Sequence, residues 1–128
     1  MKRLLTGVAG LVLVCGLITA MPALAEVLTG TKDADTLTGT QRADQIFGRG
    51  GDDVLRGRSG SDVLVGNTGD DTIKGGIAFD DIRAGKGDDR IMARDDDPDQ
   101  IKCGPGVDTI VVDRVEDGIF NCENKKEP

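Results

Sequence analysis

The sequence predicts an all-β chain, a right-handed β-solenoid of short parallel strands in two sheets, with a C-terminal cap that a disulfide closes. Three observations predict this fold class: a period of nine residues, one large apolar side chain in each period, and a pair of cysteines near the C-terminus. So short a period is typical of stacked repeats, because one unit alone cannot bury its apolar side chain.

The first 25 residues have the pattern of a secretory signal peptide. Two basic residues precede an apolar run over 4–20, and a small-x-small triplet ends at Ala25. Glycines and Pro22 interrupt the run, which favours cleavage over the alternative of a membrane anchor. A lipid-modified Cys15 is the other alternative. We therefore expect cleavage after Ala25 and a secreted, extracellular mature chain.

The composition is acidic, with a formal net charge of -7 that becomes more negative once the two basic residues of the signal peptide are removed. A nucleic acid partner is therefore not expected. The chain has no His, Trp or Tyr. Without His it cannot build a Ser/His/Asp or Cys/His mechanism or the usual catalytic zinc site, so an enzyme is not expected either. Composition alone would also be compatible with disorder.

The feature that argues against disorder is the period. Seven nine-residue units follow one another without a gap over residues 30–92: GTKDADTLT, GTQRADQIF, GRGGDDVLR, GRSGSDVLV, GNTGDDTIK, GGIAFDDIR and AGKGDDRIM. The sixth place is always aspartate, namely Asp35, Asp44, Asp53, Asp62, Asp71, Asp80 and Asp89. The eighth place is always Leu or Ile, namely Leu37, Ile46, Leu55, Leu64, Ile73, Ile82 and Ile91. Chance would not preserve both columns.

One extra residue in the acidic stretch 94–97 shifts the register, and the columns resume at Asp99 and Asp108, each two residues before an isoleucine. Nine units result. A period that survives an insertion indicates stacked turns, because each unit packs only on its neighbours. We expect one repeat domain over residues 26–102.

Within a unit, places one to six are rich in glycine, which adopts the positive φ of tight turns without a Cβ clash. Places seven to nine, such as Val54–Arg56, are expected to form a very short strand with its middle side chain pointing inward. Turn, strand, turn and strand make a coil of eighteen residues. Alternate units then stack into two parallel sheets around a thin core of Leu and Ile.

The units GRGGDDVLR, GRSGSDVLV, GNTGDDTIK and AGKGDDRIM resemble the glycine- and aspartate-rich nonapeptide of RTX, or hemolysin-type, calcium-binding proteins. The resemblance covers about residues 28–111, and it is specific because the motif repeats in register. It implies a parallel β-roll with calcium ions held between turns that are neighbours on one edge. Large toxins of this family carry separate effector domains, for which this chain has no room, so toxicity is not implied.

The aspartates of alternate units fall on opposite edges of the expected coil, so each edge carries a column of like charges. Carboxylates stacked at the strand spacing of about 4.8 Å repel one another unless a cation lies between them. Ca²⁺ accepts many hard oxygen ligands in a tolerant geometry, whereas Mg²⁺ demands a tighter octahedron and keeps its waters. We therefore expect Ca²⁺ as the cofactor.

About three well-formed calcium sites are expected, from segment 48–53 with 66–71, 57–62 with 75–80, and 66–71 with 84–89. Weaker sites at the ends are possible. The candidate metal-binding residues are Gly48, Gly50, Gly51, Asp53, Gly57, Ser59, Gly60, Asp62, Gly66, Thr68, Gly69, Asp71, Gly75, Asp80, Gly87 and Asp89.

Some units depart from the pattern. Asp33, Arg42 and Ala78 stand where the fourth-place glycine is expected, and Ala84 stands at a first place. A Cβ at positive φ costs about 1 kcal/mol or more, so these turns are expected to be altered or empty. For the units over 28–47, a metal-free N-terminal cap is as good an interpretation as a calcium site.

Two further acidic features are expected to face solvent. The fifth-place Asp52, Asp70 and Asp88 lie beside the ligating column, and solvation is favoured over a role as extra ligands. The stretch 95–99 is expected to be an exposed bulge between coils. It is not an EF-hand loop, because Gln100 stands where that pattern needs glycine.

Residues 103–123 form the expected cap, followed by a frayed tail at 124–128. Cys103 and Cys122 are the cysteines that remain once the signal peptide is removed, and in an exported chain they are expected to pair. Two free thiols are the alternative. The disulfide would hold less repetitive residues, among them Phe120, over the open end of the coil, as solenoids require.

Together these observations predict a secreted calcium-binding protein that folds when its turns bind Ca²⁺. The alternative is an extracellular adhesion or ligand-binding solenoid in which calcium is only structural. The outward places seven and nine show no repeated chemistry, such as a threonine ladder, which ranks this alternative lower. A partner other than calcium, at the cell surface or in the matrix, is not identified by the sequence.

Overall fold

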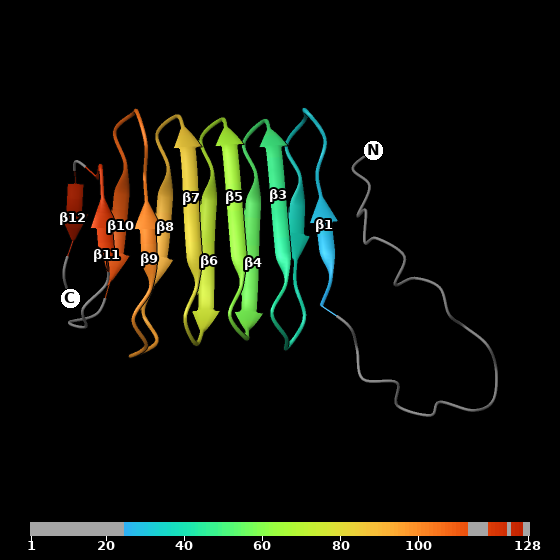
Figure 1. The fold of residues 1–128 in the computed structure, drawn as a ribbon. Coiled ribbons are helices and arrows are strands. Elements are labelled where there is room, and N and C mark those ends of the chain that lie inside the picture. The colour runs from blue at the N-terminus through green and yellow to red at the C-terminus, as the bar shows by residue number, and fades with distance from the viewer. Residues whose placement is uncertain (1–24, 113–117, 123, 127–128) are drawn as a thin grey trace, which may run out of the picture.

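The computed structural model describes residues 25–112, 118–122 and 124–126. In these residues the chain is all-β, and its parallel strands wind into a solenoid of two sheets (Figure 1), which confirms the expected fold class. No helix in the described ranges is long and apolar enough to cross a membrane. Almost all of the expected signal peptide, part of the expected cap and the end of the tail lie outside the described residues.

Odd-numbered and even-numbered strands form separate sheets, each in the order of the chain. The odd sheet contains β1 (Val27–Thr29), β3 (Gln45–Gly50), β5 (Val63–Thr68), β7 (Asp81–Lys86), β9 (Gln100–Lys102) and β11 (Gly118–Phe120). The even sheet contains β2 (Thr36–Thr38), β4 (Val54–Ser59), β6 (Thr72–Ile77), β8 (Arg90–Ala93), β10 (Thr109–Val112) and β12 (Asn124–Lys126).

Each strand pairs with the strand one coil further on. Val54 of β4 pairs with Thr72 of β6, eighteen residues away, as the period predicts. Across the acidic stretch 94–97 the spacing becomes nineteen, as Asp81 pairs with Gln100. The extra residue is therefore confined to the turn, and both columns continue past it.

The core contains one column of Leu and Ile from each sheet. Each is 1% exposed or less, and together they are Leu28, Leu37, Ile46, Leu55, Leu64, Ile73, Ile82, Ile91, Ile101 and Ile110. Burial of one such side chain contributes about 2 kcal/mol. Because each unit contributes only one such side chain, the fold depends strongly on the groups at its two edges.

The strands of the middle coils are longer than expected. β4 runs for 6 residues, from place seven of one unit to place three of the next. Place one therefore lies within a strand, and its glycine, such as Gly57, points inward and has no positive φ. The expectation that a Cβ at this place strains the backbone was wrong, which explains how Ala84 is accommodated inside β7.

Positive φ is found instead at places two and four. Gly69 and Gly87 have φ of 122° and 130°, and a Cβ on either would collide with the carbonyl of the glycine one coil earlier. Fourth-place glycines are thus needed for conformation and for close stacking of the turns. Ala78 keeps the same turn with φ 83°, at a cost of about 1 kcal/mol.

Both sheets continue beyond residue 102, where the cap was expected to begin. β10 pairs with β8, and Ile119 of β11 lies in register with Ile101. Gly118–Phe120 therefore takes places seven to nine of a tenth unit, VDRVEDGIF, which was not predicted. Phe120, which was expected to cover the open end, is 53% exposed. The cap boundary itself stays a prediction.

Cys103 and Cys122 form the expected disulfide, with their Cα atoms 5.1 Å apart. Cys103 occupies place one of its unit and is fully buried in the inward column that glycine occupies in earlier coils. Its N–H also donates to the carbonyl of Phe120 at 3.2 Å. The last coil is thus fastened to the preceding one by a covalent bond and a backbone hydrogen bond.

Candidate metal-binding edges of the coil

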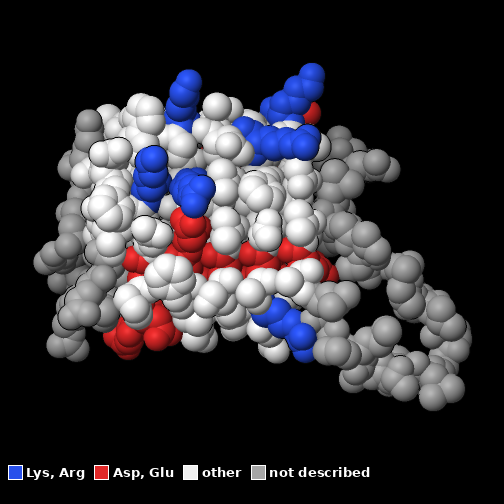
Figure 2. Space-filling view, in the orientation of Figure 1, with Lys and Arg blue, Asp and Glu red and all other residues white. Residues whose placement is uncertain are grey.

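The sixth-place aspartates lie where the chain turns from one sheet to the other, in one column along each edge. All are 4% exposed or less, although the sequence analysis placed them only at the edges without predicting their burial. Figure 2 shows acidic groups in a row that crosses the coils. Buried carboxylates need hydrogen bonds or a cation, because burial of a charge without compensation is costly.

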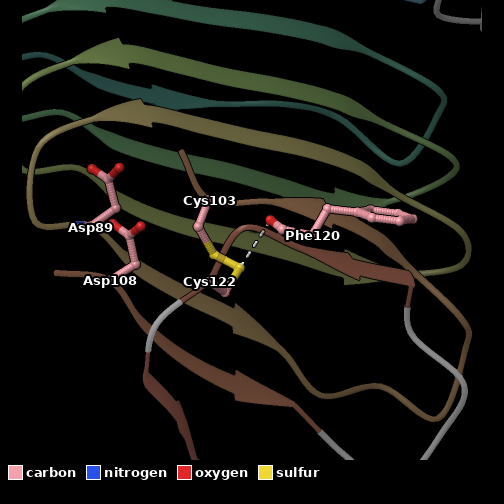
Figure 3. Close-up of a disulfide and its surroundings, with 5 residues drawn as sticks. All are labelled: Asp89, Cys103, Asp108, Phe120 and Cys122. Carbon is pink, nitrogen blue, oxygen red and sulfur yellow. Dashed lines mark hydrogen bonds between the residues drawn. A yellow bond between two sulfur atoms is a disulfide. The ribbon is translucent and has the colours of Figure 1, made fainter. Parts of the chain in front are cut away.

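One oxygen of each carboxylate joins neighbouring coils. The N–H of Asp71 donates to Oδ1 of Asp89 at 2.8 Å, and the N–H of Asp62 donates to Oδ1 of Asp80 at 2.9 Å. Asp89 and Asp108 continue the first column, and Figure 3 shows their side chains one above the other beside the disulfide. Along each edge, therefore, successive coils are joined by hydrogen bonds from a backbone N–H to the aspartate carboxylate of the next coil.

The other oxygen, Oδ2, is buried and accepts no hydrogen bond in Asp62, Asp71, Asp80 and Asp89. A buried acceptor without a partner costs about 1–3 kcal/mol, and more when it is charged. In the units of Asp62, Asp71 and Asp80, Oδ2 faces the inward glycine at place one of the same unit. A Cβ on Gly57, for example, would collide with Oδ2 of Asp62 and lie 2.5 Å from the carbonyl O of Gly75.

Burial of these carboxyls raises their pKa values. The pKa rises to about 7 for Asp71 and to about 8 for Asp80, mainly through desolvation. Repulsion by the neighbouring aspartates of the column adds to the rise, and the backbone N–H that each carboxylate accepts opposes it. Asp62 and Asp89 rise to about 6 for the same main reason. The negative charge of these carboxylates is therefore unfavourable unless a cation compensates for it.

In the first two units, Oδ2 of the sixth-place aspartate does accept hydrogen bonds. Oδ2 of Asp44 accepts hydrogen bonds from the N–H of Thr40 at 2.6 Å and from its hydroxyl at 2.9 Å. Thr31 makes the equivalent pair of bonds to Asp35. In later units, place two adopts positive φ instead, as Arg58 does at 89°. A second-place threonine thus satisfies a carboxylate that later units leave without a donor.

The acidic insertion contributes a third carboxylate to one turn. Oxygen atoms of Asp80, Asp95 and Asp99 lie within 4.8 Å of one another. Asp97 accepts a hydrogen bond from the N–H of Ala78 at 3.0 Å, which ties the insertion to the preceding turn. The expectation of an exposed bulge holds for Asp96 but not for Asp95 and Asp97, which are half-buried. Sequence spacing alone could not show which aspartate of the acidic insertion turns inward.

The fifth-place aspartates are exposed, as expected, but they also form a ladder. Oδ1 of Asp52 accepts from the N–H of Asp70, and Oδ1 of Asp70 accepts from the N–H of Asp88, both at 2.8 Å. Here the carboxylate of the earlier coil accepts, whereas in the sixth-place column the carboxylate of the later coil accepts. Adjacent turns on this edge are therefore held together in both directions.

The remaining candidate residues lie at three kinds of position. The first-place Gly48, Gly57, Gly66 and Gly75 are buried in strands, next to the carboxylate of their own unit. The third-place Gly50, Ser59 and Thr68 end their strands. The fourth-place Gly51, Gly60, Gly69 and Gly87 form the turns at positive φ. Those of odd units gather on one edge, with Asp53, and those of even units gather on the other.

This donor set suits a hard cation. Buried carboxylate oxygens without hydrogen-bond donors face an interior that backbone carbonyls also line, and no imidazole or thiolate takes part in the columns. Such an all-oxygen environment is what Ca²⁺ prefers, and softer metals prefer nitrogen or sulfur ligands. The residues therefore fit a calcium ion.

Comparison with known proteins agrees with this chemistry. The family model described as the RTX calcium-binding nonapeptide repeat, in 4 copies, matches residues 29–64 and 65–98. Searches of curated proteins and of solved structures each returned no match. The matched residues cover more than half of the sequence and contain the seven units that follow without a gap. The chain belongs to the family of RTX calcium-binding nonapeptide repeat proteins.

Proposed function

We propose that this chain is a secreted calcium-binding protein whose coil folds when its turns bind Ca²⁺. The observation that carries the proposal is the column of buried Oδ2 atoms in Asp62, Asp71, Asp80 and Asp89 that accept no hydrogen bond. Calcium supplies the positive charge that these oxygens lack. Binding rather than catalysis is proposed, because the chain has no histidine and the columns repeat one chemistry.

The proposed ligands come from turns that are neighbours on one edge. The best-formed sites combine segment 48–53 with 66–71, 57–62 with 75–80, and 66–71 with 84–89, which include Asp53, Asp71 and Asp89 on one edge. The aspartates supply carboxylate oxygens, and the glycine turns keep side chains away from the ion. The threonine-capped carboxylates of Asp35 and Asp44 support a metal-free N-terminal cap in the first two units.

A further calcium site is proposed at the insertion, where Asp95 joins Asp80 and Asp99. Three carboxylates within reach of one ion attract a divalent cation more strongly than two do. This turn also contains Ala78 in place of the usual glycine. The extra affinity that the third carboxylate gives for calcium therefore offsets the conformational cost of Ala78 in this turn.

Folding is proposed to follow calcium binding because the core is thin and the columns repel themselves. A cation that binds the folded coil but not the unfolded chain stabilises the folded state by mass action. The same ion removes the repulsion between carboxylates of successive coils. Without it, one Leu or Ile per unit must offset the ordering of nine residues.

Secretion is proposed from two features. Residues 1–25 have the pattern of a cleavable signal, and the Cys103–Cys122 disulfide is of a kind that persists in oxidising compartments. The proposed mature protein comprises a repeat domain over 26–102, a cap over 103–123 and a tail over 124–128. In the calcium-rich space outside the cell, such a chain would meet its ligand only after export.

The test is a calcium titration of the purified chain. Circular dichroism in chelator should show a largely unfolded chain, and millimolar Ca²⁺ should produce a β spectrum, while Mg²⁺ at the same concentration should not. Metal analysis after gel filtration should then find about three or more bound calcium ions per chain, as the well-formed sites require. An unchanged spectrum without bound calcium would refute the proposal.

A further inference from the structure

A groove lies on the outer face of the even sheet, away from the interior that holds the aspartate columns. Its volume is about 770 Å³, and it extends over β4, β6, β8 and β10. Five cationic side chains line it and one carboxylate does: Arg56, Arg58, Lys74, Arg90 and Arg94, with Asp95. On a chain with a net charge of -7, this is a concentration of the opposite sign.

These cations are exposed, and no ion pair seen among the described residues involves them. In the part of the chain that the structure describes, the ion pair found is between Arg83 and Asp81, on the odd sheet. Clefts lined by one sign of charge focus the field and raise the local concentration of an oppositely charged ligand. With five cations and one carboxylate in its lining, the groove favours an anionic ligand.

The register of the sheet places the cations in a patch that spans three strands. Arg56 of β4 pairs with Lys74 of β6, so these two cations follow one another along the coil axis, about 4.8 Å apart. In β8 the partner of Lys74 is Met92, and Arg90 lies two residues earlier, opposite Thr72. A ligand that meets all of them must extend over three strands and must carry several negative groups.

The other lining residues narrow the class of polyanion. No aromatic side chain lines the groove, so the base stacking that single-stranded nucleic acids use is absent. Gln41 and Ser59 offer hydrogen bonds to hydroxyl groups, and exposed Ile77 offers an apolar surface. Arginine forks match carboxylate and sulfate groups bidentately. These contacts suit a charged sugar chain.

We propose that this groove binds a linear anionic polysaccharide, whose carboxylate or sulfate groups meet the cations of successive strands. One sugar ring is comparable in length to the spacing between strands, so negative groups on successive sugars can meet Arg56 and Lys74, with Arg90 to one side. The groove meets the proposed calcium sites only at Asp95, so the proposal does not require that calcium be a ligand of the sugar.

The test measures binding of fluorescent oligosaccharides to the full chain in millimolar Ca²⁺ and low salt, with circular dichroism to verify folding. The probes are sulfated dextran oligosaccharides, galacturonate oligosaccharides and uncharged dextran of equal length. We expect binding of at least one charged probe, none of the neutral one, and an affinity that falls steeply with salt. Whichever charged probe binds more tightly identifies sulfate or carboxylate as the recognised group.

A matched pair of variants separates the groove from net charge. Arg56→Gln, Lys74→Gln and Arg90→Gln together remove three cations from the groove. Arg49→Gln, Lys86→Gln and Lys102→Gln remove three exposed cations from the odd-sheet strands β3, β7 and β9. We expect the first set to weaken binding by at least about tenfold and the second by less than about threefold.

Three results would overturn the proposal. The folded wild-type chain could leave both charged oligosaccharides unbound at low salt. The two triple variants could weaken binding equally, which would indicate net charge rather than a groove. A DNA duplex of equal charge could bind more tightly than either oligosaccharide, which would assign the groove to nucleic acid.

Discussion

The N–H of Asp62 donates a hydrogen bond to Oδ1 of Asp80, one coil further on, at 2.9 Å. Oδ2 of both carboxylates is buried and accepts no hydrogen bond. The same side chain thus joins two coils through one oxygen and offers the other to a cation. Substitutions that affect the two oxygens differently should therefore separate the stability of the coil from its affinity for calcium.

Asp71→Asn should lower calcium affinity by about tenfold or more, because it removes the charge of one ligand. In chelator it should raise the free energy of unfolding, since desolvation and like charges disfavour the buried carboxylate. The control is Asp70→Asn, which changes the exposed neighbour by the same charge. Calorimetric titration measures the affinity, and circular dichroism in chelator measures the stability as a larger folded fraction. Equal losses of affinity in the two variants would contradict this role for Asp71.

Gly66→Ala should destabilise the folded coil by about 2 kcal/mol, because overpacking of a filled interior typically costs this much. The new Cβ would collide with Oδ2 of Asp71 and lie 2.5 Å from the carbonyl O of Ala84. Gly50→Ala is the milder control, since the tightest contact of its Cβ would be with the hydroxyl of Thr68 at 3.2 Å. Urea unfolding in saturating Ca²⁺ compares them. Matching midpoints would show that the inward place has room for a methyl group.

Asp95→Asn should remove the third carboxylate of the turn at the insertion and weaken one calcium site by about tenfold or more. Asp96→Asn is the control, because Asp96 is the exposed neighbour and asparagine tolerates its φ of 68°. Calcium stoichiometry by metal analysis at low free calcium should fall for Asp95→Asn only. An unchanged stoichiometry would place Asp95 outside the ligand set.

The calcium-free coil should become more stable as the pH falls. Folded Asp71 and Asp80 hold protons up to about pH 7 and 8, whereas ordinary aspartates release theirs near 3.8. Between these values the folded state binds more protons than the unfolded chain, so the free energy of unfolding decreases as the pH rises. Circular dichroism in chelator at pH 5 and pH 8 checks the sign, since the folded fraction should be larger at pH 5. Greater stability at pH 8 would be the contrary result.

Protons and calcium should also compete for the same oxygens. Calcium affinity is expected to increase from pH 5 to pH 8, in the opposite direction to the stability of the calcium-free coil. Calorimetric titration across this range measures it. A calcium affinity that does not change with pH would mean that these buried carboxyls are not the ligands.

Replacement of the disulfide by Cys103→Ala with Cys122→Ala should lower the free energy of unfolding by about 3 kcal/mol in the chain-entropy model. The cysteines are 19 residues apart. Alanine is the suitable replacement, because Ala84 and Ala93 already occupy the same inward column. Hydrogen exchange should show the loss mainly in β9 to β11. A loss spread evenly over all coils would contradict local closure by the disulfide.

The fold was largely predictable because its information is local and repeated. One aspartate and one Leu or Ile in every nine residues indicate the coil of eighteen residues, the two sheets and the identity of the core. The tenth unit, VDRVEDGIF, was missed although it follows the ninth in register. It has the aspartate and the isoleucine of the two columns, Asp117 and Ile119, so the same two columns could have identified it.

The sequence placed the candidate aspartates at the edges of the coil, but it did not show their environment. Sequence spacing places Asp62 and Asp80 on one edge, yet it cannot show that their Oδ2 atoms are buried without a donor. That depends on the conformation of place two, where Thr40 satisfies Asp44 but Arg58, at positive φ, leaves its carboxylate without such a bond. The difference arises from the backbone conformation of place two within one unit.

By itself the sequence determined the period, the register, the core column and the chemistry of the repeated carboxylates, because these follow from side-chain spacing along one chain. The tertiary structure alone decided which oxygens are buried, that Asp95 turns toward Asp80, and that Arg56, Lys74 and Arg90 share one groove. Those relationships join residues of different coils. They follow from the stacking of coils at the strand spacing, which brings together side chains that are far apart in the sequence.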